Sequence, residues 1–87
     1  MALKYVKTVS GVGVPGDSPH EIYTDDLFKR DGVMLHRYTD KEGFERSAIF
    51  QNGVEISNVD RCREQEMICA IRRQLYLYKF GAKNTFM

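Results

Sequence analysis

Two cysteines are the most reactive side chains in the chain, and their spacing argues against joint chemistry. Cys62 and Cys69 lie seven residues apart in a segment that predicts one long helix. Seven helical residues rise about 10.5 Å, beyond the roughly 7 Å that a disulfide spans between Cα atoms. We therefore interpret both as small, buried hydrophobic side chains, with an intermolecular disulfide or a metal site as the alternatives.

Two histidines, His20 and His36, would complete a metal-ligand set with the cysteines. The spacing of the four residues matches no zinc-binding pattern, so we predict no metal site. His36 falls on a predicted strand beside Arg37, where it could act as a general base. A strand histidine is far more often structural, and we assign it no catalytic role.

The motifs of common enzyme classes are absent from the sequence. It contains no G-x-S-x-G, no H-E-x-x-H and no Cys-x-x-Cys. The carboxylate pairs Asp25/Asp26 and Glu64/Glu66 are adjacent or two residues apart, which does not aim them at one point on a helix. Residues 11–16 match G-x-G-x-x-G, but the chain is too short for two nucleotide-binding halves, so we interpret them as a turn. We predict a protein that is not an enzyme and holds no cofactor.

Length and composition indicate one small domain, residues 1–87, with a single core. Thirteen Lys and Arg against 12 Asp and Glu give a net charge of +1, which is weak for a nucleic-acid-binding protein. The charge is +2 over residues 1–16, −4 over 17–56 and +3 over 57–87. The sequence shows neither an uncharged apolar run of about 18 residues nor the apolar core of a signal peptide. We therefore expect a cytoplasmic protein that does not enter the membrane.

Alternating apolar residues predict an antiparallel sheet. Residues 3–9 form a first strand, and residues 33–38, 44–50 and 54–57 form a three-stranded meander. Asn52-Gly53 favours a tight hairpin turn, because these residue types tolerate positive φ. The predicted fold class is α+β: a meander of three strands plus an N-terminal strand, packed on one long C-terminal helix.

Residues 19–30 allow two interpretations. Residues 18–21 read SPHE, a helix-start pattern with an N-cap Ser, a Pro in the first turn and a closing Glu. The apolar residues that follow are spaced only loosely as in a helix. A short helix near 19–30 and an extended segment with a turn at Asp25-Asp26 both remain open.

The long C-terminal helix is the most informative predicted element. Residues 57–60 read SNVD, an S-x-x-D capping pattern that favours a start at Val59 or Asp60. Gly81 favours an end after Phe80. At 3.6 residues per turn, the helix has two apolar faces: one of Met67, Ile68, Ile71, Leu75 and Tyr78, and a second of Cys62, Cys69, Tyr76 and Phe80.

The first of these faces suits packing on the sheet, and the second has two possible uses. The N-terminal strand and the tail would cover it, or it would bind a protein partner or a second copy of the chain. On the second interpretation the partner interface is Cys62, Cys69, Tyr76 and Phe80, and the protein self-associates as a homodimer through this helix.

The meander and helix carry the residues of one family pattern. Gly32-Val33 opens the first strand, Ala48-Ile49 precedes Asn52-Gly53, and residues 80–86 read FGAKNTF at the end. On these residues, segment 32–86 resembles the three-stranded-sheet-plus-helix DNA-binding domains of the ethylene-response-factor and integrase arm-binding type. The resemblance implies that the sheet enters the major groove of DNA. The side chains that would then contact DNA are Arg37, Lys41 and Arg46.

Charge decides between the two functions that remain. Asp40, Glu42 and Glu45 stand beside the three basic residues of the meander and would repel phosphate. We therefore favour a non-enzymatic small binding protein, an adaptor or inhibitor of a protein partner of the kind that phages and mobile elements encode. The alternative is a DNA-binding module that uses its three-stranded sheet.

Overall fold

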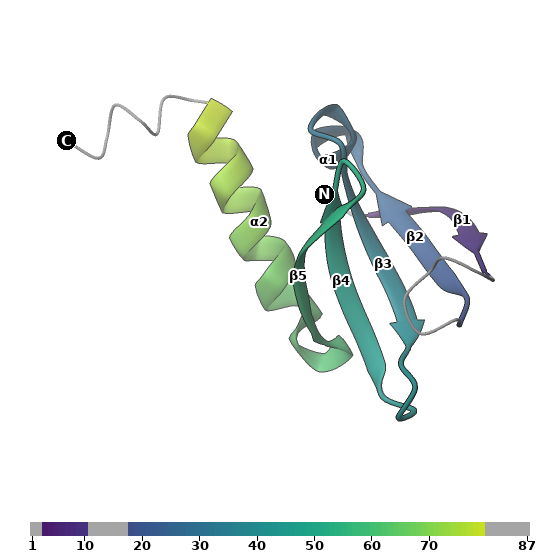
Figure 1. The fold of residues 1–87 in the computed structure, drawn as a ribbon. Coiled ribbons are helices and arrows are strands. Elements are labelled where there is room, and N and C mark those ends of the chain that lie inside the picture. The colour runs from purple at the N-terminus through teal and green to yellow at the C-terminus, as the bar shows by residue number, and fades with distance from the viewer. Residues whose placement is uncertain (1–2, 11–17, 80–87) are drawn as a thin grey trace.

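A computed structural model describes residues 3–10 and 18–79, with the backbone alone at 76–79. It shows an α+β fold in which one antiparallel sheet carries a long helix on one side (Figure 1). The sheet has five strands in the order β1-β2-β3-β4-β5, each antiparallel to the next. The elements are β1 (Lys4–Val9), β2 (His20–Thr24), α1 (Asp26–Arg30), β3 (Val33–Thr39), β4 (Glu45–Gln51), β5 (Val54–Asp60), the 3-10 turn η2 (Arg61–Arg63) and α2 (Glu64–Lys79). In the part of the chain so described, no helix combines the length and apolar character needed to cross a membrane.

The α+β class is confirmed, but the sheet has one strand more than the sequence predicts. Residues 20–24 form β2 between β1 and β3, which is the extended alternative for this segment, and the short helix is confined to residues 26–30. Buried His20 and Ile22 alternate with exposed Glu21, which is the period of a strand. The short helix α1 begins only after Asp25, whose carboxylate accepts a hydrogen bond of 2.9 Å from the Phe28 N–H.

The start of the long helix also differs from the prediction. Strand β5 continues to Asp60, and α2 begins at Glu64 after the turn of η2. Asp60 makes no side-chain cap; it pairs across the sheet with Arg46, at 2.5 Å between Oδ1 and Nη1. The S-x-x-D pattern at 57–60 therefore fails as a helix start because these residues complete the ladder with β4.

Two other local predictions are confirmed. The Asn52-Gly53 turn links β4 and β5 with φ of 51° and 83°, the positive values that such a hairpin turn requires. The first face of the long helix packs on the sheet through Met67, Ile68 and Ile71, with Leu75 partly buried beside them, while the side chain of Tyr78 lies outside the described atoms. The core that they join is formed by Phe28, Val33, Leu35 and Ile49.

The cysteines do not belong to that core. Cys62 in η2 and Cys69 in α2 are both free and exposed, so the prediction that they are buried is wrong. The reason is geometric: α2 buries one stripe against the sheet, and both cysteines fall outside that stripe.

Candidate partner-binding groove

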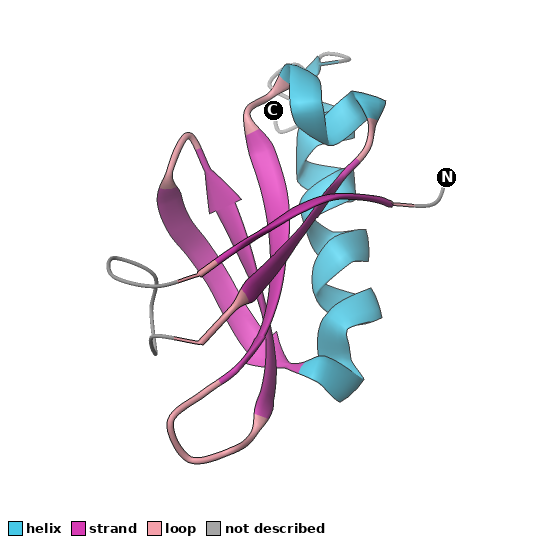
Figure 2. Ribbon diagram, turned by 90° about the vertical axis from the view of Figure 1, so that its right-hand side faces the viewer, coloured by secondary structure: helices cyan, strands magenta, loops and turns pink. Residues whose placement is uncertain are grey.

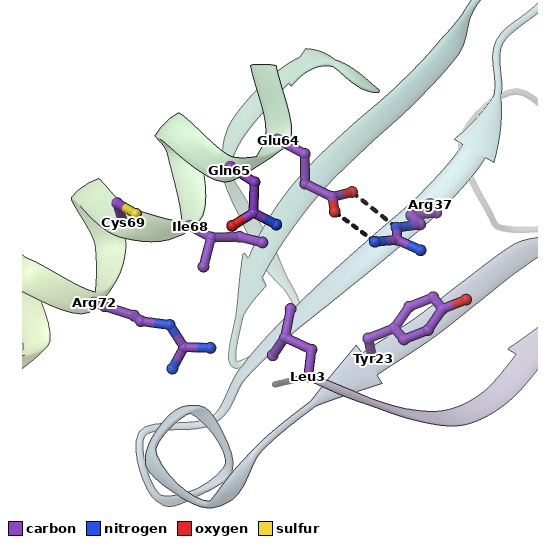
Figure 3. A pocket seen from close by; sticks show the side chains of 8 residues that line it. All are labelled: Leu3, Tyr23, Arg37, Glu64, Gln65, Ile68, Cys69 and Arg72. Carbon is purple, nitrogen blue, oxygen red and sulfur yellow. Dashed lines mark hydrogen bonds and ion pairs between the residues drawn. The ribbon is translucent and has the colours of Figure 1, made fainter. Parts of the chain in front are cut away.

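A groove lies where α2 leaves part of the sheet uncovered. The helix packs over β3, β4 and β5, so a space of about 390 Å³ remains between it and the β1 side of the same sheet face. The sheet side of the groove is formed by Leu3, Tyr23 and Arg37. The helix side is formed by Glu64, Gln65, Ile68, Cys69 and Arg72 (Figure 3).

The centre of the groove is apolar. Leu3 from the sheet side and Ile68 from the helix point toward the same space (Figure 3), and Ile68 continues into the core with only 4% of its surface exposed. Tyr23 packs beside Leu3 against that core, and the ring of Tyr5 meets the Tyr23 ring edge-on at 5.8 Å. Exposed Cys69 adds a polarisable thiol to the helix side.

One end of the groove is closed by an ion pair that joins β3 to the first turn of α2. The Arg37 guanidinium donates from Nε and Nη2 to the two carboxylate oxygens of Glu64, at 2.8 and 2.5 Å. The Ser47 hydroxyl donates to the same carboxylate at 2.5 Å. Glu64 is 5% exposed, and this two-pronged geometry satisfies its charge inside the protein. The Arg37 guanidinium also lies 4.6 Å from the centre of the Tyr23 ring.

This arrangement shifts the pKa values of both Glu64 and Arg37. Burial alone would raise the pKa of Glu64, but hydrogen bonds from Arg37 and Ser47 outweigh it and hold the pKa below its ordinary value. The hydrogen bond to Glu64 likewise raises the pKa of Arg37. Both groups are therefore charged at neutral pH and bound to each other, so neither is poised to act as a general acid or base.

The other end of the groove is held by a second ion pair. Arg72 of α2 reaches Asp25 at 2.6 Å and lies with its guanidinium 4.8 Å from the centre of the Phe28 ring. Asp25 thus caps α1 and fixes α2 at the same time. Burial alone would raise the pKa of Asp25, but the Phe28 N–H and Arg72 outweigh it and lower that pKa.

The residues predicted as a partner interface are only partly brought together. Cys69 lines the groove, whereas Cys62 lies in η2 and is not among its lining residues. Tyr76 falls within α2, but its side chain lies outside the described atoms, and Phe80 lies outside the described residues altogether.

The residues predicted to touch DNA are separated by the sheet. Arg37 pairs with Ser47 across β3 and β4 and faces α2, whereas Arg46 pairs with Tyr38 and faces the opposite side. Arg46 donates to Asn58 at 2.9 Å and forms the ion pair with Asp60. Lys41 is exposed in the turn between β3 and β4.

Sequence reasoning missed Glu64 as an organising residue, although a signal was present. Glu64 precedes Met67, Ile68 and Ile71 at the spacing i, i+3, i+4, i+7, so it lies on the buried stripe of α2. An acidic residue on such a stripe needs an internal partner. Arg37 supplies it from a strand 27 residues earlier, a distance that no local pattern reveals.

The groove combines an apolar centre with two ion pairs at its ends. The charges at those ends are therefore satisfied within the protein. Comparison with models of protein families, with curated proteins and with solved structures found no match.

Proposed function

We propose that the protein is a non-enzymatic binding module, an adaptor or inhibitor that takes a segment of a protein partner into the groove beside α2. One observation carries the proposal: apolar Leu3, Tyr23 and Ile68 face an open space of about 390 Å³. That size lies in the range of sites that accept a small ligand or a few side chains. An apolar anchor in such a space is the kind of contact that dominates protein recognition.

The electrostatics of the groove favour an apolar anchor over a charged one. The charges at its two ends, Arg37 with Glu64 and Arg72 with Asp25, are already paired inside the protein. A charged ligand would have to break one of these pairs, whereas an apolar side chain gains contact without that cost. Gln65 and Cys69 on the helix side remain able to hydrogen-bond to a peptide backbone.

The chain provides a matched pair of variants to test this function. Cys69→Arg would fill the groove from its exposed side, and Cys62→Arg would place the same side chain at an exposed position that does not line it. A displayed library of random peptides is the probe, followed by titration of the enriched peptides. We expect peptides that share one large apolar residue, and binding weakened at least about tenfold by Cys69→Arg but unchanged by Cys62→Arg.

Either of two results would overturn the proposed function. One is a selection that enriches no peptide on the unaltered protein. The other is an enriched set whose affinity does not respond to Cys69→Arg, since those peptides would bind elsewhere.

The alternative, DNA binding through the three-stranded sheet, has less support. Arg37 and Arg46 lie on opposite faces of that sheet and are each engaged by a carboxylate. Only Lys41 of the three predicted contacts has no such partner among the ion pairs of the described residues. Self-association through the second face of α2 and a cytoplasmic location remain predictions.

A further inference from the structure

The sheet face that points away from α2, here called the open face, has no helix on it among residues 3–10 and 18–79. Both helices lie on the other side, as Figure 2 shows, and α1 contributes Phe28 to the core under α2. The uncovered face of an antiparallel sheet is normally polar. Here its middle strands present Met34, His36 and Phe50, with the His36 and Phe50 rings 4.2 Å apart.

The accessible apolar part of the open face lies toward one end. Met34 is 36% exposed there, beside partly buried Phe50, with which it pairs. The opposite end is closed by its own side chains, since the rings of His20 and Tyr38 stack at 4.1 Å and both residues are buried. At one end of the open face the side chains are therefore buried against one another, and at the other end an apolar patch is exposed.

A bulge in β1 gathers positive charge at one edge of this face. Lys4 and Lys7 are three residues apart, so a regular strand would point them to opposite faces. The register shifts between Tyr5 and Lys7. As a result Tyr5 and Thr8 share the helix side, with 2.7 Å between their hydroxyl oxygens, and both lysines lie on the open face.

A bulge in β5 places Glu55 and Asp60 on this face at the other edge, where Asp60 is paired with Arg46. Glu55 and Asp60 are five residues apart, yet Glu55 pairs with Phe50 and Asp60 with Arg46. Phe50 and Arg46 both belong to the open face, and so do the two acids. The Asn58 amide donates to Glu55 at 3.3 Å, which confirms that these side chains lie on one side of the strand.

The register puts the opposite charges at one level of the sheet. Lys4 pairs with Thr24 across β1 and β2, and Met34, Phe50 and Glu55 lie side by side across β3, β4 and β5. The two sets lie at one level because Tyr23, next to Thr24, pairs with Leu35, next to Met34. A two-fold axis parallel to the strands and above β3 would lay β1 of one copy over β5 of the other. Lys4 would then face the partner's Glu55, twice in each dimer. An axis across the strands would instead place β1 over β1 and lysine against lysine.

We propose that the open face binds a second copy of this chain, sheet against sheet, around a two-fold axis parallel to the strands. Met34 on β3 then lies over the partner's Met34, Phe50 on β4 lies over β2 of the second copy, and Lys4 at one edge pairs with Glu55 of the other copy. Aligned packing of this kind is an established arrangement of two sheets. Four strand spacings by about six residues give roughly 19 × 20 Å on each copy, which is smaller than a standard interface, so we expect the dimer only at high protein concentration.

Charge reversal tests the proposed axis. Sedimentation equilibrium at low salt should show a dimer whose dissociation constant rises about tenfold or more in Lys4→Glu and in Glu55→Lys. The double variant should regain the affinity of the unaltered protein. Each contact between positions 4 and 55 then again joins an acidic to a basic side chain, with the two charges exchanged. Lys29→Glu, an exposed reversal on α1, should change nothing.

A zero-length cross-link tests the geometry itself. A carbodiimide joins a lysine to a carboxylate only in direct contact, and Lys4 and Glu55 of one chain stand on opposite edges, about 19 Å apart. In a mixture of light and heavy isotope-labelled chains we expect a Lys4–Glu55 link between one light and one heavy peptide.

Three outcomes would overturn this dimer: a monomer at every concentration, a dimer indifferent to both reversals, or a cross-link confined to other residues. The groove lies on the opposite side of the sheet, so a failure of this proposal is distinguishable from a failure of the proposed function. Cys69→Arg should leave the dimer intact, and Lys4→Glu should leave peptide binding intact.

Discussion

The two faces of the sheet differ in how they treat polar side chains. On the face under α2, the buried carboxylate of Glu64 is bound within the chain by an ion pair with Arg37 and a hydrogen bond from Ser47. On the open face the centre is aromatic, and lysines on β1 and Glu55 on β5 stand at opposite edges without a mutual contact. The open face pairs Arg46 with Asp60 in the same way, but it keeps Lys4 and Glu55 apart at its two edges.

The largest effect should come from breaking the buried pair under α2. Glu64→Ala leaves Arg37 without its anion and Ser47 without its acceptor, and we expect a loss of about 3 kcal/mol in the free energy of unfolding. Urea denaturation followed by circular dichroism measures it. Glu66→Ala is the matched control on the same helix, because its pair with Arg63 is exposed and should contribute roughly 0.3 kcal/mol. Equal losses in the two variants would contradict the distinction between a covered and an exposed charge.

His36 on the open face should make the free energy of unfolding depend on pH, over a higher pH range than the carboxylates under α2 do. Burial, together with the nearby charge of His20, lowers the pKa of His36 from 6.5 to about 4. Below pH 6.5, His36 therefore binds a proton in the unfolded chain but not in the folded protein. Stability is complete above that pH and falls as the pH drops toward 4, by about 2 kcal/mol once solvent access is allowed for.

His36→Asn isolates this contribution, since asparagine does not titrate. Urea midpoints between pH 7 and 4 should fall less steeply in the variant than in the unaltered protein. Glu64 and Asp25 have lowered pKa values in the folded protein. Their contribution to stability is lost at lower pH, once the pH falls below the pKa values of these carboxyl groups in the unfolded chain. An identical pH profile in the variant would show that His36 is not the group that senses acid.

The smallest expected effect concerns DNA. With Arg37 and Arg46 on opposite faces and bound to carboxylates, we expect no retarded band in a gel-shift assay at low salt. Duplexes of mixed sequence and a basic DNA-binding protein as positive control complete the experiment. A complex that weakens with salt and is lost in Arg46→Gln would restore the DNA-binding interpretation and assign it to the open face.

Local patterns predicted the parts of this fold that depend on neighbours in sequence. The meander strands, the Asn52-Gly53 turn and the apolar stripe of α2 each follow from a repeat of two or 3.6 residues or from tolerance of positive φ. Local patterns left residues 19–30 open between a short helix and an extended segment, and pairing with β1 and β3 makes residues 20–24 a strand despite the helix-start pattern at 18–21. The prediction failed at residues 57–60, where the ladder with β4 displaced a capping box. In both places partners distant in sequence compete with a local signal, and the sheet hydrogen bonds win.

The sequence by itself determined an α+β chain with a near-neutral charge and without the common catalytic motifs. Only the tertiary structure decided which charges meet. Arg37 finds Glu64 because β3 and the first turn of α2 lie on the same side of the sheet, and Arg46 is turned away by the alternation of the strand. Lys4 and Lys7 share a face because one extra residue shifts the register of β1. Side-chain direction in a sheet depends on register, and register is set by pairing between strands, which spacing along the chain does not encode.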